Sequence, residues 1–199
     1  MAVQIQKPEL ATFIHLQKNA GSSISKWLEK NLDGQRFWGK HGGIGAIAKK
    51  AGGIENLGYT FAVVRNPFAR AVSTYHYQVR KVEERQVKVD KGATRYTQQD
   101  LDETRQLVGV GFSQWLLNLP QHYLFRSQLD LTDGVDYVMK MENLLEEFEV
   151  IQKRFNCYVP LDHRNKSNHK HYREYYNEKA KKRILDSCSK DLETFGYEW

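Results

Sequence analysis

The sequence is poor in cysteine and has no long hydrophobic run. Its two cysteines, Cys157 and Cys188, are far apart and lack C-x-x-C spacing, which argues against a disulfide scaffold and a structural zinc site. Apolar runs such as residues 61–64 are far shorter than the roughly 20 residues that cross a bilayer. No apolar signal segment opens the chain either. We therefore expect a cytoplasmic protein with no membrane partner.

The charge is modestly positive and does not by itself define a partner. Among 199 residues, 30 Lys and Arg face 24 Asp and Glu, which gives a net charge of +6. Such an excess favours an anionic ligand, but nucleic acid, a phosphorylated small molecule and an acidic sugar all fit it. With 40% hydrophobic residues the chain can form a core, which excludes disorder of the whole. The length predicts one domain over residues 1–199.

Strand and helix patterns alternate along the chain. Residues 11–16 form a β-prone apolar run, and Ile24, Trp27 and Leu28 follow it at helical spacing. A second apolar run at residues 59–64 precedes a helix with Pro67 in its first turn. Further patterns indicate a strand at 135–139 and helices at 44–50, 112–119, 144–155 and through 184–188. We predict an α/β fold, with a central parallel sheet flanked by helices, in a single domain.

Residues 80–105 do not follow this alternation. They are polar and charged, with scattered valines and no sustained period. We predict a variable insertion or lid at about residues 80–110.

The loop after the first strand is suited to an anion. It lies between a strand and a helix, where Gly21 permits close approach of the backbone, Ser22 and Ser23 add hydroxyl groups, and Lys18 adds a charge. Lys18 precedes the glycine, and no G-x-x-x-x-G-K-[ST] pattern occurs, so an ordinary kinase or GTPase is disfavoured. A plain strand-to-helix turn with an exposed lysine and a serine cap remains the alternative.

A second group of residues follows the second strand. Arg65 stands at the end of that strand and Ser73 about two turns into the next helix. An arginine can bind a phosphate through two parallel hydrogen bonds. The two groups together would suit a ligand with two separated phosphates. A structural salt bridge of Arg65 and a solvent-facing Ser73 are the alternative.

Both segments resemble motifs of one enzyme family. The run FIHLQKNAGSS at residues 13–23 is similar to the 5′-phosphosulfate loop of sulfotransferases that use 3′-phosphoadenosine 5′-phosphosulfate (PAPS). The run FAVVRNPFARAVSTY at residues 61–75 resembles their 3′-phosphate motif. Residues 165–167 through 195–197 resemble the end of the carbohydrate-type branch. Three departures are Asn19, where threonine is common, Gln17, where proline is common, and Ala69, where aspartate is frequent.

The resemblance implies a P-loop-like sulfotransferase fold and a set of ligand-binding residues. Lys18 would contact the sulfate-bearing end of PAPS and stabilise the charge that develops as the sulfuryl group leaves. The nucleotide would be bound by Lys18, Asn19, Ala20, Gly21, Ser22, Ser23, Arg65, Ser73, Lys166 and Ser167. The product would be adenosine 3′,5′-bisphosphate, the acceptor a hydroxyl group on a saccharide, and no metal is required.

Histidines are the candidate bases for deprotonating such a hydroxyl. A histidine titrates near neutral pH, and His41, between the two motifs, resembles the base position of glycosaminoglycan 2-O-sulfotransferases. His76, one turn after Ser73, is the reserve candidate, and His15 is expected to be buried. His163, His169 and His171 match no compact zinc spacing, so we expect no metal there.

Two other functions fit parts of the sequence. A non-catalytic nucleotide-binding module of the same fold would retain PAPS without consuming it. A nucleic-acid-binding protein could use the basic stretch at residues 163–173, although a solvated loop is the commoner explanation of such a stretch. The motifs favour the small nucleotide over nucleic acid.

Overall fold

The computed structural model describes residues 1–38, 42–92, 97–120, 126–162 and 169–199. Contacts divide the chain into two compact units, the first made of Met1–Asn66 with Arg126–Lys166 and the second of Pro67–Phe125 with Ser167–Trp199. Each unit has a hydrophobic core of its own. The assignment of the whole chain to one domain stays a prediction.

The first unit is built on a five-stranded sheet in the order β3-β1-β2-β4-β5. Its strands are β1 (Ala2–Ile5), β2 (Ala11–Ile14), β3 (Gln35–Trp38), β4 (Tyr59–Val64) and β5 (Tyr137–Lys140). The three predicted strands correspond to β2, β4 and β5, which are parallel to one another. The predicted parallel centre of the sheet is confirmed by these three strands, whereas the sheet as a whole is mixed, because β1 runs antiparallel to both β2 and β3.

The two strands missed from the sequence give little local signal. Each has only four residues, too few to show a period of two over several repeats. β3 lies at the edge of the sheet and exposes Gln35 and Arg36, so its sequence lacks the apolar pattern of a buried strand. Pairing with β1 is what makes it a strand.

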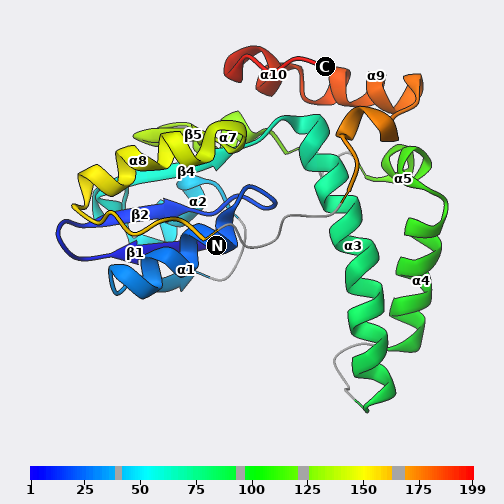
Figure 1. Cartoon of the computed structure of the whole chain (residues 1–199), viewed down its shortest axis with the longest axis horizontal. Helices are drawn as coiled ribbons and strands as arrows, with labels where there is room; N and C mark the ends of the chain where they lie inside the picture. Colours follow the sequence, from blue (N-terminus) through cyan, green and yellow to red (C-terminus); the bar gives the residue numbers. More distant parts are fainter. Residues whose placement is uncertain (39–41, 93–96, 121–125, 163–168) are drawn as a thin grey trace. The chain divides into compact units, whose positions relative to one another are not determined.

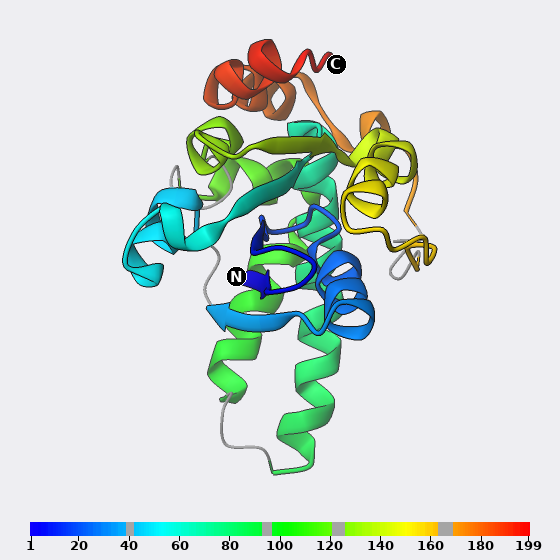
Figure 2. The same cartoon turned by 90° about the vertical axis from the view of Figure 1, so that its left-hand side faces the viewer.

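Helices cover both faces of this sheet (Figure 2). On one face, α1 (Gly21–Asn31) and α8 (Leu144–Arg154) pack together through Trp27 and Phe148, whose rings meet edge to face at 5.0 Å. The other face is covered by α2 (Ile44–Ala51) and the short helix η1 (Glu55–Leu57), with Thr12 donating a hydrogen bond to the backbone oxygen of Leu57 at 2.7 Å. Two short helices, α7 (Gln128–Thr132) and η2 (Met141–Asn143), flank β5 in the chain. The unit is therefore a three-layer α/β structure.

The second unit is helical in the residues that the structure describes. It contains α3 (Pro67–Asp90), α4 (Gln98–Gly109), α5 (Phe112–Asn118), η3 (Tyr172–Tyr175), α9 (Glu178–Ser187) and α10 (Ser189–Phe195). Figure 1 shows α3 and α4 lying side by side. Its core is rich in aromatic side chains around Phe68 and the fully buried Trp115.

The predicted insertion at about residues 80–110 thus contains regular helices. Of its described apolar side chains only Val82, Leu101 and Val108 are buried, which is why no helical period stood out. The start of α4 is fixed by a capping box, in which the side chains of Thr97 and Asp100 each bind the other's backbone amide. Whether residues 80–110 act as a lid stays a prediction.

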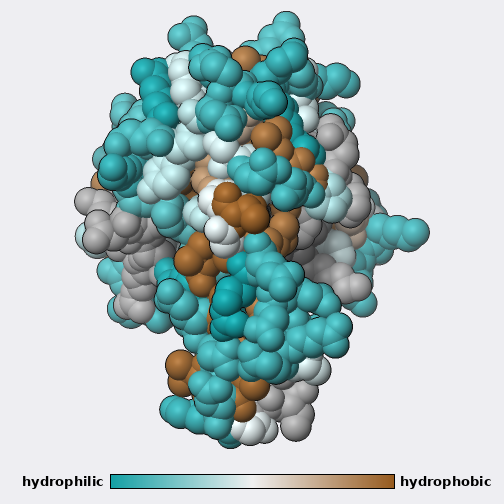
Figure 3. Space-filling model, turned by 90° about the vertical axis from the view of Figure 1, so that its right-hand side faces the viewer, coloured by the Kyte–Doolittle hydropathy of each residue, from teal (hydrophilic) through white to brown (hydrophobic). Residues whose placement is uncertain are grey.

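Much of the face of the molecule seen in Figure 3 is hydrophilic, with hydrophobic patches near its middle and lower end.

Within the described ranges, no helix combines the length and the apolar character that crossing a membrane requires.

Candidate anion-binding site

The loop between β2 and α1 has an unusual backbone. Lys18 and Ala20 have φ angles of 68° and 55°, in the left-handed region that non-glycine residues rarely adopt. Such turns can bring neighbouring backbone amides together into a concave surface that binds anions. Two such residues in one short loop indicate that its shape is held by its surroundings.

The first turn of α1 has no side-chain cap. Ala20 occupies the N-cap position and offers no side-chain acceptor, and the turn contains no acidic residue. Ser22 is exposed beside these amides, whereas Ser23 is buried. The positive end of the helix dipole and its amide groups can therefore stabilise an anion without competition from a capping side chain.

Gly21 is required here by a histidine ring. A Cβ atom built on Gly21 would lie 1.8 Å from both Cδ2 and Nε2 of His15. His15 is 5% exposed, as the sequence predicted, and its ring stacks on Phe13 at a centroid distance of 5.9 Å. Close packing inside the protein, rather than approach of a ligand, is the reason that the structure gives for this glycine.

The two predicted motifs meet at one edge of the sheet. Because β2 and β4 are parallel neighbours, their carboxyl ends lie together, and the loop after β2 comes next to Arg65 after β4. The half-buried Arg65 donates from Nη1 to the backbone oxygen of Lys18 at 3.3 Å. The Arg65 side chain thus contacts the backbone of the loop at Lys18, which lies 47 positions earlier in the sequence.

Asn19 faces the interior. Its side chain is 1% exposed, and Nδ2 donates to the backbone oxygen of Val63 at 2.8 Å and to Oε1 of Gln128 at 2.7 Å. The predicted ligand contact of Asn19 is thereby restricted to its backbone. Gln128, to which the sequence gave no pointer, also binds the backbone nitrogen and oxygen of Arg65 at 3.0 and 2.8 Å. No motif indicates this glutamine, because it lies in a helix of only five residues.

A small cavity of about 50 Å³ opens beside α1, the helix that follows the anion-binding loop. Its lining includes Ser23, the basic side chains Lys26 and Lys30, and the acidic Asp162. The indole nitrogen of Trp27 donates to the backbone oxygen of Val159 at 2.7 Å, which fixes the far wall. The positive character of the loop therefore continues along α1.

Ser73 and His76 belong to the second unit and lie one turn apart on α3. Ser73 is buried, in the position two turns into the helix that the sequence predicted. The ring of His76 stacks on that of His169 at a centroid distance of 5.1 Å, and Tyr175 meets His76 edge to face at 5.1 Å. In the part of the chain that the structure describes, the Nε2 atoms of both histidines are buried without a hydrogen-bond partner.

The stacked pair of His76 and His169 predicts that the second unit becomes less stable as the pH falls. Burial, and secondarily the neighbouring His169, lower the pKa of His76 below its ordinary value of 6.5. The unfolded chain then binds a proton more readily than the folded one, so this contribution to stability is present above pH 6.5 and is lost as the pH falls below it. Urea unfolding between pH 7.5 and 5 should show a shallower loss of stability for His76→Gln than for the unsubstituted protein.

Lys179→Gln provides the control for that experiment, because Lys179 is exposed in the same unit. It should leave the pH dependence unchanged. Equal slopes for His76→Gln and the unsubstituted protein would contradict the prediction.

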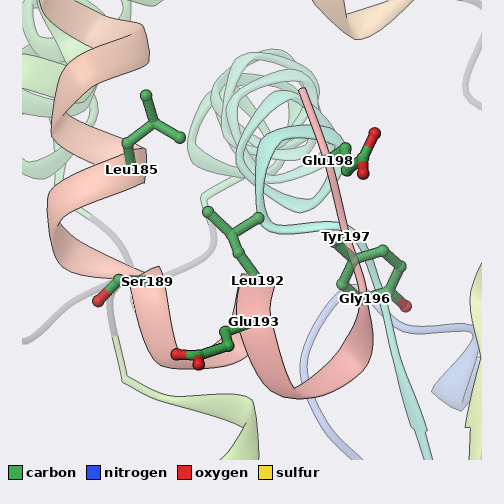
Figure 4. A pocket seen from close by; sticks show the side chains of 7 residues that line it. All are labelled: Leu185, Ser189, Leu192, Glu193, Gly196, Tyr197 and Glu198. Atoms are coloured by element: carbon green, nitrogen blue, oxygen red, sulfur yellow. The ribbon is translucent and has the colours of Figure 1, made fainter.

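A larger cavity in the second unit does not suit an anion. It has a volume of about 410 Å³ and lies between α9, α10 and the segment that follows them (Figure 4). Leu185 and Leu192 line it together with the carboxylates of Glu193 and Glu198, and none of the described residues that line it is cationic. A phosphate group would be repelled there.

Several predicted residues lie outside the described residues, namely His41, His163, Lys166 and Ser167. Their roles stay predictions. Among the residues that are described, no group of three or more His, Cys, Asp and Glu side chains could hold a metal ion.

A scan against protein-family models, a search of curated proteins and a search of solved structures each returned no match. The functional proposal therefore rests on the residues of this chain and their geometry.

Proposed function

We propose that this chain is a sulfotransferase that moves the sulfuryl group of PAPS to a hydroxyl group of a saccharide. The observation that carries the proposal is the hydrogen bond from Arg65 to the backbone of Lys18, which joins two sulfotransferase-like motifs at the carboxyl edge of the sheet. The uncapped start of α1 and the left-handed loop residues lie at the same place. Together they offer backbone amides and two cations to a phosphorylated ligand.

In this proposal each of the two motifs binds a different phosphate group of the nucleotide. The backbone of residues 18–23 and the hydroxyl groups of Ser22 and Ser23 bind the 5′-phosphate. Arg65 binds the 3′-phosphate, and the resemblance assigns Ser73 to the same group. Lys166 and Ser167 complete the set by resemblance alone.

The chemical step is a transfer between two oxygen atoms. The acceptor oxygen attacks sulfur, the bond between sulfur and the 5′-phosphate oxygen breaks, and the hydroxyl proton passes to a base. The Lys18 ammonium group stabilises the negative charge that develops on the leaving oxygen. His41 is the proposed base, with His76 in reserve. The products are a sulfate ester and adenosine 3′,5′-bisphosphate.

Thermal unfolding with nucleotides tests the binding half of this proposal. Adenosine 3′,5′-bisphosphate at 100 times its Kd should stabilise the protein by about 2.7 kcal/mol. Adenosine 5′-phosphate at the same concentration should stabilise it much less, because Arg65 then has no 3′-phosphate to bind. Arg65→Ala should remove most of that difference, whereas Arg36→Ala, an exposed arginine of β3, should retain it.

Activity assays with labelled PAPS and saccharides test the second half. Binding of the bisphosphate without consumption of PAPS would favour the non-catalytic module. Sulfation of phenols or amines alone would refute a saccharide acceptor. Oligonucleotide binding that weakens steeply with salt, with no thermal shift from the bisphosphate, would instead favour a nucleic-acid-binding protein.

A further inference from the structure

We infer that Gln128 is a positioning residue that fixes the spacing between the two phosphate-binding parts of the site. The inference rests on the proposed function, and it assigns a role to a residue that belongs to neither motif. Gln128 is 0% exposed, so it acts through Asn19 and Arg65 rather than by touching a ligand.

The carboxamide of Gln128 joins these two residues through three hydrogen bonds. Oε1 accepts from Nδ2 of Asn19 at 2.7 Å and from the backbone nitrogen of Arg65 at 3.0 Å. Nε2 donates to the backbone oxygen of Arg65 at 2.8 Å. A side chain that binds both backbone groups of one residue restrains its position as a neighbouring strand would.

Gln128 restrains the backbone of Arg65 at the point where the hydrogen bonds of the sheet end. The pairing of β4 with β5 ends at Val64 and Lys140, so Arg65 is the first residue beyond it. Asn19, held between Gln128 and the backbone oxygen of Val63, attaches the left-handed loop to the same point. Without Gln128, the loop and Arg65 would each lose a buried anchor, and their buried polar groups would lose partners.

The functional consequence is selectivity for the 3′-phosphate. A ligand with two phosphates gains affinity from both only if the loop and Arg65 stay at a matching distance. A change at Gln128 should therefore weaken adenosine 3′,5′-bisphosphate more than adenosine 5′-phosphate, which needs only the loop. The readout is the Kd of adenosine 5′-phosphate divided by the Kd of adenosine 3′,5′-bisphosphate, here called the Kd ratio. A merely structural role of Gln128 would not change this ratio.

Titration calorimetry with both nucleotides tests this inference. We expect Gln128→Ala to lower the Kd ratio about ten-fold. That change corresponds to a loss of about 1.4 kcal/mol from the binding energy that the 3′-phosphate adds. The matched control is Thr60→Val, which removes another side-chain hydrogen bond of this unit, from Oγ1 of the buried Thr60 to Asp136 at 2.7 Å. That variant should lower the melting temperature and leave the ratio unchanged.

Gln128→Glu supplies a conservative variant with its own pH signature. Its ionised carboxylate can accept from Asn19 and from the Arg65 amide, but it cannot donate to the Arg65 carbonyl. Burial should raise the pKa of the introduced carboxyl, and its protonated form can donate again. Relative to the unsubstituted protein at each pH, the Kd ratio of Gln128→Glu should be low at pH 8 and recover towards pH 5.5.

The outcomes separate this inference from the proposed function. If the unsubstituted protein does not bind the bisphosphate, the proposed function fails and the inference fails with it. If it binds, but Gln128→Ala or Gln128→Glu at pH 8 has an unchanged Kd ratio, the inference alone is overturned. Should Gln128→Ala fail to fold, the ratio for Gln128→Glu and its recovery at low pH decide the matter.

Discussion

Replacing Lys18 by alanine is expected to lower kcat for sulfuryl transfer about 10²- to 10³-fold, the usual cost of removing one group that stabilises charge in a transition state. The ammonium group of Lys18 is proposed to act on the leaving oxygen, whose charge is larger in the transition state than in bound PAPS. The affinity for adenosine 3′,5′-bisphosphate should therefore change much less than kcat. Single-turnover assays with labelled PAPS, together with calorimetry, separate the two quantities.

The variant should leave the loop intact. Lys18 has a φ angle of 68°, and alanine meets the same steric cost as lysine in that region, so the backbone strain is retained. Lys49→Ala, an exposed lysine in the last turn of α2, is the matched control and should retain full activity. A kcat of Lys18→Ala within about three-fold of the control, at saturating PAPS, would exclude the proposed role.

Gly21→Ala is expected to have the largest effect on stability of any single methyl group added to this site. The new Cβ atom would lie 1.8 Å from the His15 ring, which is itself packed against Phe13. Inserting a methyl group into such a contact typically costs about 1–3 kcal/mol. For a chain of this length, that corresponds to a fall in melting temperature of roughly 2–12 °C. Displacing the start of α1 should also weaken nucleotide binding.

Two further variants show whether the clash is the cause. Gly45→Ala places the same methyl group on an exposed position of α2 where no atom of the described residues lies within 4 Å, and it should stabilise the protein by about 0.5–1 kcal/mol. His15→Ala combined with Gly21→Ala should be less destabilised than the sum of the two single changes, because the ring that clashes is gone. Strict additivity would show that the cost of Gly21→Ala arises elsewhere.

Local sequence patterns were sufficient for the elements that combine a continuous apolar run with a helix of clear period. They predicted the parallel centre of the sheet and the helices that follow β2, β4 and β5. They failed at β1 and β3, where four residues carry no period, and over residues 80–109, which form the second half of α3 and all of α4. That part of the two helices is polar and charged, and of its described hydrophobic side chains only Val82, Leu101 and Val108 are buried. Helices of that kind are stabilised mainly by packing on each other, which no local window contains.

The candidate site divides in a similar way. The residue types of Lys18, Gly21 and Arg65, and their order in the chain, are enough to point to an anionic ligand. The reason for Gly21 is different from the one inferred from the sequence, because the space that its missing side chain leaves is filled by His15. Gln128 could not be found at all, since a buried glutamine in a five-residue helix has no sequence signature.

The scarcity of cysteine and of long apolar runs, the net charge of +6 and the two motifs are properties that the amino-acid sequence determined by itself. They depend on residue types and on spacings within one segment. Which residues meet was decided only by the tertiary structure: Arg65 with Lys18 across 47 positions, and Gln128 with Asn19 across 109. Parallel pairing of β2 and β4 brings those segments together, and contacts over such separations exist only once the sheet has formed.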